Sequence, residues 1–189
     1  PNVTNKPVLN SGATGSVNNL IIESGSSLTI SGNTIQVSGS ITNNGTFDAS
    51  EGTIELNGSS PQIIGASVFN GNTIKNLAIN NSGGVSLMGP LNITGEVKVQ
   101  NGNLDSDGYL TLVSSDLQTA LIDGSGAGTI TGNVTMQRYI TSAFGYKYIS
   151  SPFQSATVNE FDDEIDLSAD FPPFYSYDES STTSGWAEY

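Results

Sequence analysis

Residues 52–58 read Gly-Thr-Ile-Glu-Leu-Asn-Gly, and residues 95–102 read Gly-Glu-Val-Lys-Val-Gln-Asn-Gly. In both stretches apolar residues alternate with polar ones, which indicates a β-strand with one buried face. The flanking glycine and asparagine residues tolerate a positive φ and therefore suit tight corners. Short strands and turns of this kind recur from Val17 to Met136, and none of this stretch has the apolar spacing of an amphipathic helix. The sequence therefore predicts an all-β fold.

Two all-β architectures are compatible with this pattern. A β-sandwich needs strands of about five to six residues and aromatic side chains to fill a core about 10 Å thick. A β-solenoid needs shorter strands, corners of Gly and Asn, and a thin aliphatic core that stacks coil on coil. Residues 1–138 contain only three aromatic residues, Phe47, Phe69 and Tyr109, which favours the solenoid. We expect about six coils of about 20 residues, with Asn and Thr side chains forming ladders along the axis.

The Asn-Gly pairs add a further hint of regularity. They occur at positions 44–45, 57–58 and 70–71, and again at 101–102. The first three pairs are 13 residues apart, which suggests a loose internal period of that length.

The composition changes near Arg138. Twenty of the 22 glycines lie at or before Gly132, whereas 12 of the 15 aromatic residues and nine of the 18 acidic residues lie after Arg138. We therefore expect an N-terminal cap or linker over residues 1–16, a right-handed parallel β-solenoid (β-helix) over 17–138, and an aromatic, acidic β segment over 139–189. We interpret the last segment as part of a sandwich-like domain that is incomplete in this chain.

Charge and composition exclude several classes of protein. The chain has five Lys and Arg residues against 18 Asp and Glu residues, a formal net charge of −13. It therefore lacks a basic surface for nucleic acid or for an anionic membrane. It contains no Cys and no His, which excludes a disulfide framework, a zinc finger and a Ser-His-Asp triad. No apolar run is long enough to span a bilayer.

Two parts of the sequence resemble a known group of proteins. The runs 43–49, 52–58 and 74–81 resemble the β-solenoid repeats of large secreted surface proteins of Bacteroidota, which are adhesin-like or gliding-associated and are exported by the type IX secretion system. Residues 132–140 and 145–152, Gly-Asn-Val-Thr-Met-Gln-Arg-Tyr-Ile and Gly-Tyr-Lys-Tyr-Ile-Ser-Ser-Pro, resemble the passage that follows those repeats. The resemblance implies a secreted, cell-surface setting and no catalytic residues. It also implies that the chain is a fragment, because such proteins continue into further strands and a sorting domain.

Two acidic clusters are weak candidates for structural calcium. Residues 103–108 read Asn-Leu-Asp-Ser-Asp-Gly, which places oxygen ligands at alternate positions, with Asp105 and Asp107 as the carboxylates. The acidic residue that would complete a calcium loop is missing, because Ser114 stands at its position. The second cluster, 160–166, holds five carboxylates, of which Asp162, Asp163, Glu164 and Asp166 are the candidate ligands. The simpler interpretation is a solvated polar corner in the first case and a solvated loop in the second, so no cofactor is expected.

Paired carboxylates also raise the possibility of a polysaccharide lyase or hydrolase. Asp105 with Asp107, or Asp48 with Glu51, are the pairs that could act as acid and base. The region before Arg138 lacks the aromatic platform and the cationic residues that such a cleft needs. We therefore predict that the chain is not an enzyme.

The aromatic segment offers two further candidates. Tyr175, Tyr177 and Trp186 could stack on sugar rings, although they could equally form the core of a small β-domain. Arg138 is expected to lock the junction between the two segments, either by stacking on an aromatic ring among Tyr139, Tyr146 and Tyr148 or by pairing with an acid.

Together these observations predict a non-enzymatic rod or spacer of an adhesin-like surface protein. Its expected partners are other cell-surface proteins, glycans, or the type IX secretion machinery with this chain as cargo. The alternatives are a glycan-binding module or a β-helix polysaccharide lyase or hydrolase.

Overall fold

The computed structural model describes residues 12–141, 147, 157–162, 165–170 and 173–188 of the 189-residue chain. The chain divides into two compact units, Pro1–Ser142 and Ala143–Tyr189, which are described separately below. Of the predicted N-terminal cap, residues 1–11 lie outside the described residues and Thr14–Val17 form the first strand.

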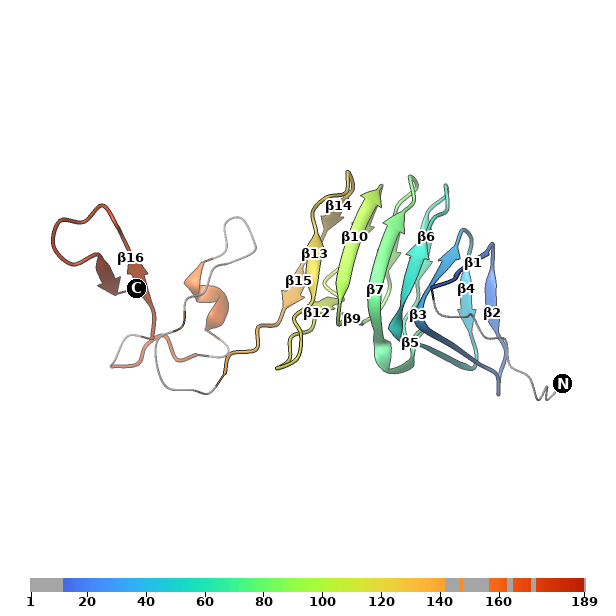
Figure 1. The fold of residues 1–189 in the computed structure, drawn as a ribbon, viewed down its shortest axis with the longest axis horizontal. Helices are drawn as coiled ribbons and strands as arrows, with labels where there is room; N and C mark the ends of the chain where they lie inside the picture. The colour runs from blue at the N-terminus through green and yellow to red at the C-terminus, as the bar shows by residue number, and fades with distance from the viewer. Residues whose placement is uncertain (1–11, 142–146, 148–156, 163–164, 171–172, 189) are drawn as a thin grey trace. The chain divides into compact units, whose positions relative to one another are not determined.

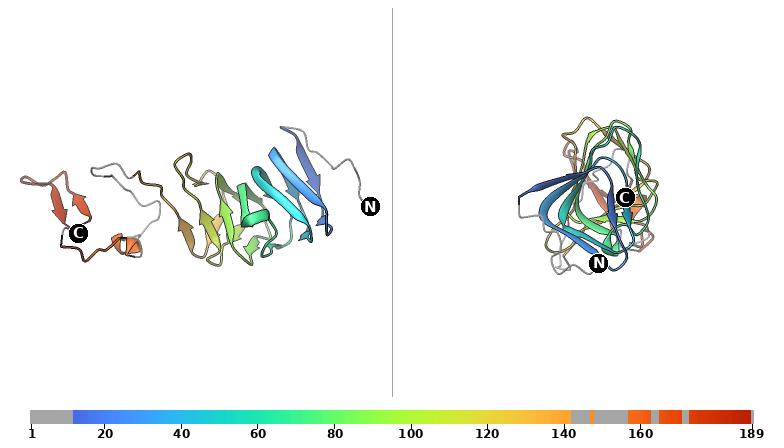
Figure 2. Two further views of the ribbon diagram at one scale, coloured as in Figure 1. Left: turned by 90° about the horizontal axis from the view of Figure 1, so that it is seen from below. Right: turned by 90° about the vertical axis from the view of Figure 1, so that its right-hand side faces the viewer.

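The first unit is a parallel β-solenoid of about six turns, with almost no helix (Figure 1). Seen end-on, its coils superpose around a shared interior (Figure 2). Within the described residues of this unit, one 3-10 turn, η1 (Asn70–Asn72), interrupts the strands. The strands are β1 (Thr14–Val17), β2 (Leu20–Ile22), β3 (Ser27–Val37), β4 (Ile41–Asn43), β5 (Thr46–Leu56), β6 (Gln62–Ile64), β7 (Thr73–Asn80), β8 (Val85–Leu87), β9 (Leu91–Ile93), β10 (Glu96–Asn101), β11 (Asn103–Asp105), β12 (Leu110–Leu112), β13 (Leu121–Asp123), β14 (Thr129–Thr131) and β15 (Val134–Met136).

The strands pair in parallel from coil to coil. The largest sheet runs β1-β3-β5-β7-β9-β12-β15, and β10 lies between β7 and β13 at its side. A second sheet runs β14-β11-β8-β6, and β2 pairs with β4 in a third. β3, β5 and β7 are long because each bends and contributes to two of the stacked ladders. Strands from different turns of the chain thus complete one another's backbone hydrogen bonds, which is how a solenoid satisfies its polar backbone.

The register fixes the length of each coil. Successive partners in one ladder are Gly15, Ile35, Ile54, Leu77, Val97 and Ile122, so that the five steps contain 20, 19, 23, 20 and 25 residues. The expected coil of about 20 residues is confirmed for three steps, and the other two carry insertions. The 13-residue spacing of the Asn-Gly pairs is not the coil length, so that suggestion from the sequence is wrong. The pairs occupy different corners: 44–45 follows β4, 57–58 follows β5, and 70–71 lies in η1.

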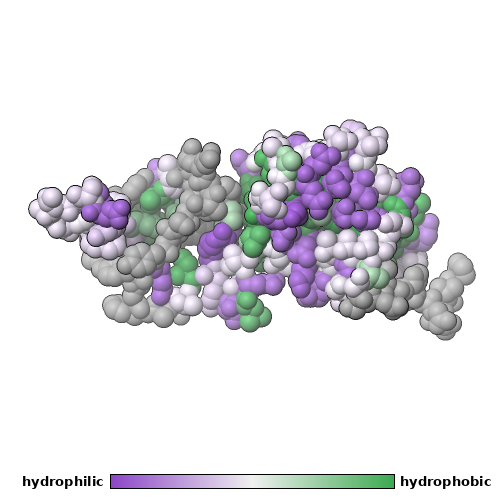
Figure 3. Space-filling model, turned by 45° about the horizontal axis from the view of Figure 1, so that its top comes forward, coloured by the Kyte–Doolittle hydropathy of each residue, from purple (hydrophilic) through white to green (hydrophobic). Residues whose placement is uncertain are grey.

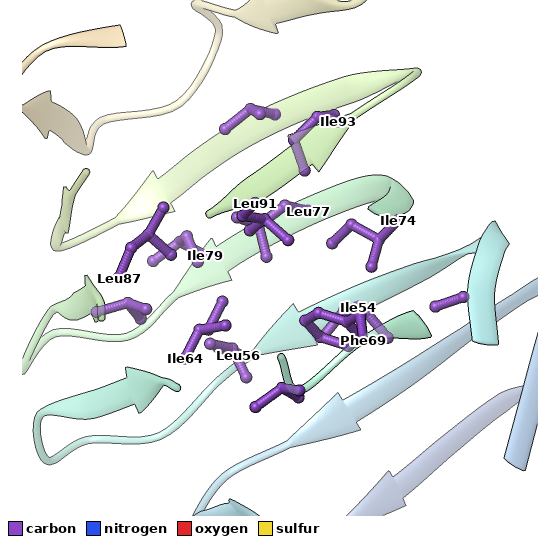
Figure 4. Packing of buried hydrophobic residues seen from close by; sticks show 14 of the residues in the cluster. Ile54, Leu56, Ile64, Phe69, Ile74, Leu77, Ile79, Leu87, Leu91 and Ile93 are labelled. Carbon is purple, nitrogen blue, oxygen red and sulfur yellow. The ribbon is translucent and has the colours of Figure 1, made fainter. Parts of the chain in front are cut away.

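Inward-facing side chains of successive coils stack into a thin, mainly aliphatic core (Figure 4). Ile54 and Leu77 are register partners, as are Leu56 and Ile79, and all four are at most 1% exposed. Phe47 and Phe69 are the aromatic members, with ring centroids 5.1 Å apart. Burial of such columns against their neighbours is the main stabilising contribution, at about 25 cal/mol for each Å² of apolar surface.

Outward-facing polar side chains form ladders between coils, as the sequence predicted. The Ser16 hydroxyl donates to Gln36 Oε1 at 2.6 Å, and Gln36 Nε2 donates to Glu55 Oε2 at 2.9 Å. Asn76 Nδ2 donates to the Thr53 hydroxyl at 3.1 Å. One face of the unit is correspondingly dominated by hydrophilic residues (Figure 3).

The second unit is described only in part. It contains the 3-10 turn η2 (Val158–Phe161) and one antiparallel hairpin of β16 (Tyr175–Tyr177) and β17 (Trp186–Glu188). Phe161 packs on Phe174 with ring centroids 5.4 Å apart. Within the described residues of this unit the hairpin is the single sheet, so the predicted sandwich-like segment is not confirmed.

Candidate functional site

The first predicted calcium site is a tight corner after β11. Asp107 and Gly108 both have a positive φ, 45° and 79°, and the backbone N–H of Asp107 donates to Asp105 Oδ1 at 3.3 Å. Ser106 between them is fully buried, and its hydroxyl lies 2.9 Å from the Thr131 carbonyl and 2.7 Å from the Asn133 carbonyl. The corner is therefore anchored to the next coil by Ser106, while Asp105 and Asp107 are exposed to solvent.

The second predicted calcium site lies around η2. Asp162 directly follows η2 and is exposed, whereas Asp163 and Glu164 lie outside the described residues. Asp166 closes a local turn, in which its Oδ1 accepts from the Ser168 hydroxyl at 2.7 Å and from the Ser168 backbone N–H at 3.0 Å. The hydrogen bond from the Ser168 hydroxyl is the largest cause that lowers the pKa of Asp166, and the hydrogen bond from the Ser168 backbone N–H lowers it further. Among the residues that the structure describes, no group of three or more acidic side chains is placed to hold a metal ion.

The three predicted sugar-stacking residues come together on the hairpin of the second unit. Tyr177 and Trp186 are directly opposite each other in the register, with ring centroids 4.9 Å apart and planes tilted by 54°. Tyr177 is 62% and Trp186 is 49% exposed. Tyr175, two residues before Tyr177, lies on the same face of β16 and is half-buried. The hairpin thus presents a small aromatic face.

The candidate acid–base pair of Asp48 and Glu51 is divided between separate interactions. Asp48 Oδ1 accepts from the backbone N–H and hydroxyl of Ser50, at 3.0 and 2.7 Å. Glu51 Oε2 instead pairs with Lys75 Nζ at 3.2 Å on the surface. Each carboxylate is therefore engaged with a different partner.

A second ion pair joins adjacent coils. Lys98 Nζ lies 2.5 Å from Asp123 Oδ2 and 2.9 Å from the Ser125 hydroxyl. The hydrogen bond from Lys98, followed by those from the Ser125 backbone and hydroxyl, lowers the pKa of Asp123 to about 2. Neither ion pair was predicted from the sequence, because each joins residues 24 or 25 positions apart whose proximity depends on the register.

Arg138 is exposed, and its Nη1 donates to the Gln137 carbonyl at 2.8 Å. Tyr146 and Tyr148, two of the tyrosines around which its stacking role was predicted, lie outside the described residues. The backbone N–H of the adjacent Tyr139 instead donates to the Ser114 hydroxyl at 2.9 Å, which ties the segment after β15 to the preceding coil.

The structure also contains a polar depression that sequence reasoning missed. It lies between the coil of β4 and β5 and the coil of β6 and β7, has a volume of about 290 Å³, and is lined in part by Asn43, Ser67, Asn70 and Asn72. The one signal in the sequence is the length of segment 65–72, whose eight residues exceed the five of the connection before it (57–61) and the four of the connection after it (81–84).

Comparisons with known proteins add no further assignment. No family model, curated protein or solved structure matches the chain. In the part of the chain that is described, no helix is long and apolar enough to cross a membrane.

Proposed function

We propose that the chain is a rod or spacer in a secreted, adhesin-like protein of a bacterial cell surface. The observation that carries this proposal is the continuity of side-chain interactions from coil to coil. The outward residues Ser16, Gln36 and Glu55 bridge three successive coils, and Lys98 and Asp123 bridge two more. These side chains stabilise the stack itself and do not converge on a catalytic cleft. A stack of this kind transmits load through backbone ladders and through a continuous core.

The resemblance of the repeats and of residues 132–152 to Bacteroidota surface proteins supports the same role. On this proposal the chain is exported by the type IX secretion system, contacts that machinery as cargo, and then supports attachment or gliding through other surface proteins or glycans. We also infer a right-handed coil, since parallel strand–crossover–strand connections are almost always right-handed.

Labelling and attachment assays on the source organism test the proposal. Antibodies against the full chain should label intact cells, and cells that lack the protein should attach less to a surface. Unlabelled intact cells, or attachment that is unchanged in the deletion strain, would contradict a surface role.

A glycan-binding module is the second candidate, favoured by the exposed ring pair of Tyr177 and Trp186. Exposed aromatic rings stack on the apolar faces of pyranoses. Trp186→Ala should then abolish retention on a glycan array, whereas Tyr109→Ala, which removes an exposed ring from the solenoid, should leave retention unchanged. Equal retention of the Trp186→Ala variant and the wild type would exclude this role for the hairpin.

We further propose that the chain acts without catalysis and without a cofactor. The acidic corner at Asp105 and Asp107 and the loop at 160–166 remain the places at which calcium could bind. A calcium titration followed by thermal unfolding tests both. If calcium raises Tm in the wild type but not in Asp105→Asn, the ion binds at the corner, and if it does not do so in Asp166→Asn, the ion binds at the loop. Either result would overturn the cofactor-free proposal.

An assay on acidic polysaccharides tests the absence of catalysis. Release of reducing or unsaturated ends would overturn the proposal that the chain is not an enzyme.

A further inference from the structure

The polar depression between the second and third coils is built by an insertion. The coil from Ile54 to Leu77 contains 23 residues, whereas its two neighbours contain 19 and 20. The extra residues fall in segment 65–72, because only residues 44–45 connect β4 to β5 in the coil before it. At the same place β4 and β6 belong to separate sheets and do not pair with each other. The strand pairing on this face of the solenoid is therefore interrupted where the depression lies.

We propose that this depression is a binding site for one neutral sugar residue of a glycan. The site lies wholly within the solenoid unit and uses neither Tyr177 nor Trp186. It also stands independently of whether the chain bears load at a cell surface.

The depression is held in shape by the core beneath it. Val68 and Phe69 of the insertion are 8% and 3% exposed, and the Phe69 ring packs on the fully buried Phe47. Asn43 Nδ2 donates to the Val68 carbonyl at 2.7 Å, which ties the insertion to the preceding coil. Phe69 and Ile54 both belong to the packed core (Figure 4). The segment is thus anchored from below and from one side, and a preformed site loses little conformational entropy when a ligand binds.

The backbone of the insertion is strained where it lines the depression. Ser67 and Asn72 have φ values of 59° and 53°, and they are two of the three non-glycine residues with positive φ in the described chain. Gly71 beside them has a φ of 60°. Non-glycine residues in this conformation are strained, and such residues concentrate at binding and switch sites.

The lining selects for a neutral, hydroxylated ligand. Asn70 and Asn72 offer amide donors and acceptors, and Thr46 and Ser67 offer hydroxyl groups. These four side chains make no hydrogen bond to any described residue, so their polar groups are available to a ligand. No Lys, Arg, Asp or Glu is among the described residues that line the depression. A carboxylate or phosphate would therefore find no cation at the site and would be repelled by a chain of net charge −13, and the ammonium group of an amino sugar would find no carboxylate there.

The size of the depression matches one sugar ring. Its volume of about 290 Å³ is at the lower limit for small-molecule sites. Because a single ring makes few contacts, we expect a dissociation constant in the millimolar range, about 1–10 mM.

Two-dimensional NMR of the full 15N-labelled chain tests the proposal directly. The probes are D-glucose, D-galactose, D-mannose, N-acetyl-D-glucosamine and L-fucose, with D-glucuronate and D-glucosamine as charged controls. At least one neutral sugar should shift the side-chain amide resonances of Asn70 and Asn72 and the backbone resonances of 67–72 in a saturable way. The charged controls should leave these resonances unshifted.

Variants then locate the site. Asn70→Ala removes an exposed side chain, and Asn72→Gly removes an amide while glycine keeps the positive φ. Each should weaken sugar binding by about tenfold or more. Asn80→Ala, at an exposed asparagine on the end of β7, should bind like the wild type. The proposal is overturned if no neutral sugar shifts these resonances, if the charged controls shift them equally, or if both depression variants bind as the wild type does.

Discussion

Gly102 shows at the scale of one residue how closely two coils approach at a corner. Its φ is +83°, and a Cβ at this position would lie 1.8 Å from the Asn81 carbonyl oxygen. Gly102→Ala should lower the free energy of unfolding by about 3 kcal/mol, since it combines left-handed backbone strain with a clash against main-chain atoms. Gly108→Ala is the matched control: φ is +79°, but nothing lies within 4 Å of the added Cβ. It should cost about 1 kcal/mol. Equal losses in urea unfolding would show that the corner can widen.

The hydrogen bonds of Asp123 predict how the stability of the folded chain depends on pH. Its pKa is about 2 in the folded chain, against 3.8 for an unperturbed group, with the hydrogen bond from Lys98 as the largest cause. A depressed folded-state pKa contributes stability above the unfolded-state pKa, and that contribution is lost as the pH falls from 3.8 toward 2. In Lys98→Met, the carboxyl titration of Asp123 followed by NMR should move up toward 3.8. An unchanged midpoint would assign the shift to Ser125 instead, for which Ser125→Ala is the complementary variant.

At the scale of elements, the two insertions of the solenoid are not equivalent. The first, 65–72, places Phe69 in the core at 3% exposure. The second lies in the coil from Val97 to Ile122, which contains 25 residues. It includes a small loop that is closed by the bridge between Ser114 and Thr119, and the side chain of Leu117 in this loop is 90% exposed. Phe69→Ala should cost about 3–5 kcal/mol, because it leaves a cavity beside Phe47. Leu117→Ala removes an apolar side chain from the other insertion and should change stability by less than about 0.5 kcal/mol. Thermal unfolding of both variants compares them, and similar losses would contradict the difference in packing.

The strands could be predicted from the sequence where they depend only on the local alternation of apolar and polar residues. Alternation such as Ile54-Glu55-Leu56 and the scarcity of aromatic residues before Arg138 were sufficient to predict a solenoid with a thin core. The alternate spacing of Tyr175 and Tyr177 likewise places both rings on one face of β16. The depression was not predictable, because it depends on which residues of 65–72 turn inward. The Lys98–Asp123 pair depends on a 25-residue coil whose extra length the sequence does not reveal.

At the scale of the whole solenoid unit, each coil contacts only its neighbours, so stability should vary along the stack. β7, β9 and β10 have partner strands on both sides, whereas β1, β14 and β15 each pair with one strand among the residues that the structure describes. Burial follows the same gradient: Leu77 is 1% exposed, but Ile130 of β14 is only partly buried. Hydrogen exchange of the full chain should therefore be at least about tenfold slower in the central strands than in the terminal ones.

The response to core substitutions distinguishes graded opening from a single cooperative transition. Leu77→Ala, in a central coil, should cost about 2–5 kcal/mol and accelerate exchange throughout the solenoid, because unfolding of that coil removes the support of the coils on both sides. Ile130→Ala, in the last coil, should accelerate exchange only in β14 and its neighbours. If both variants accelerate every strand equally, the solenoid unfolds as one unit. In that case the solenoid unfolds as a whole and does not fray from its ends.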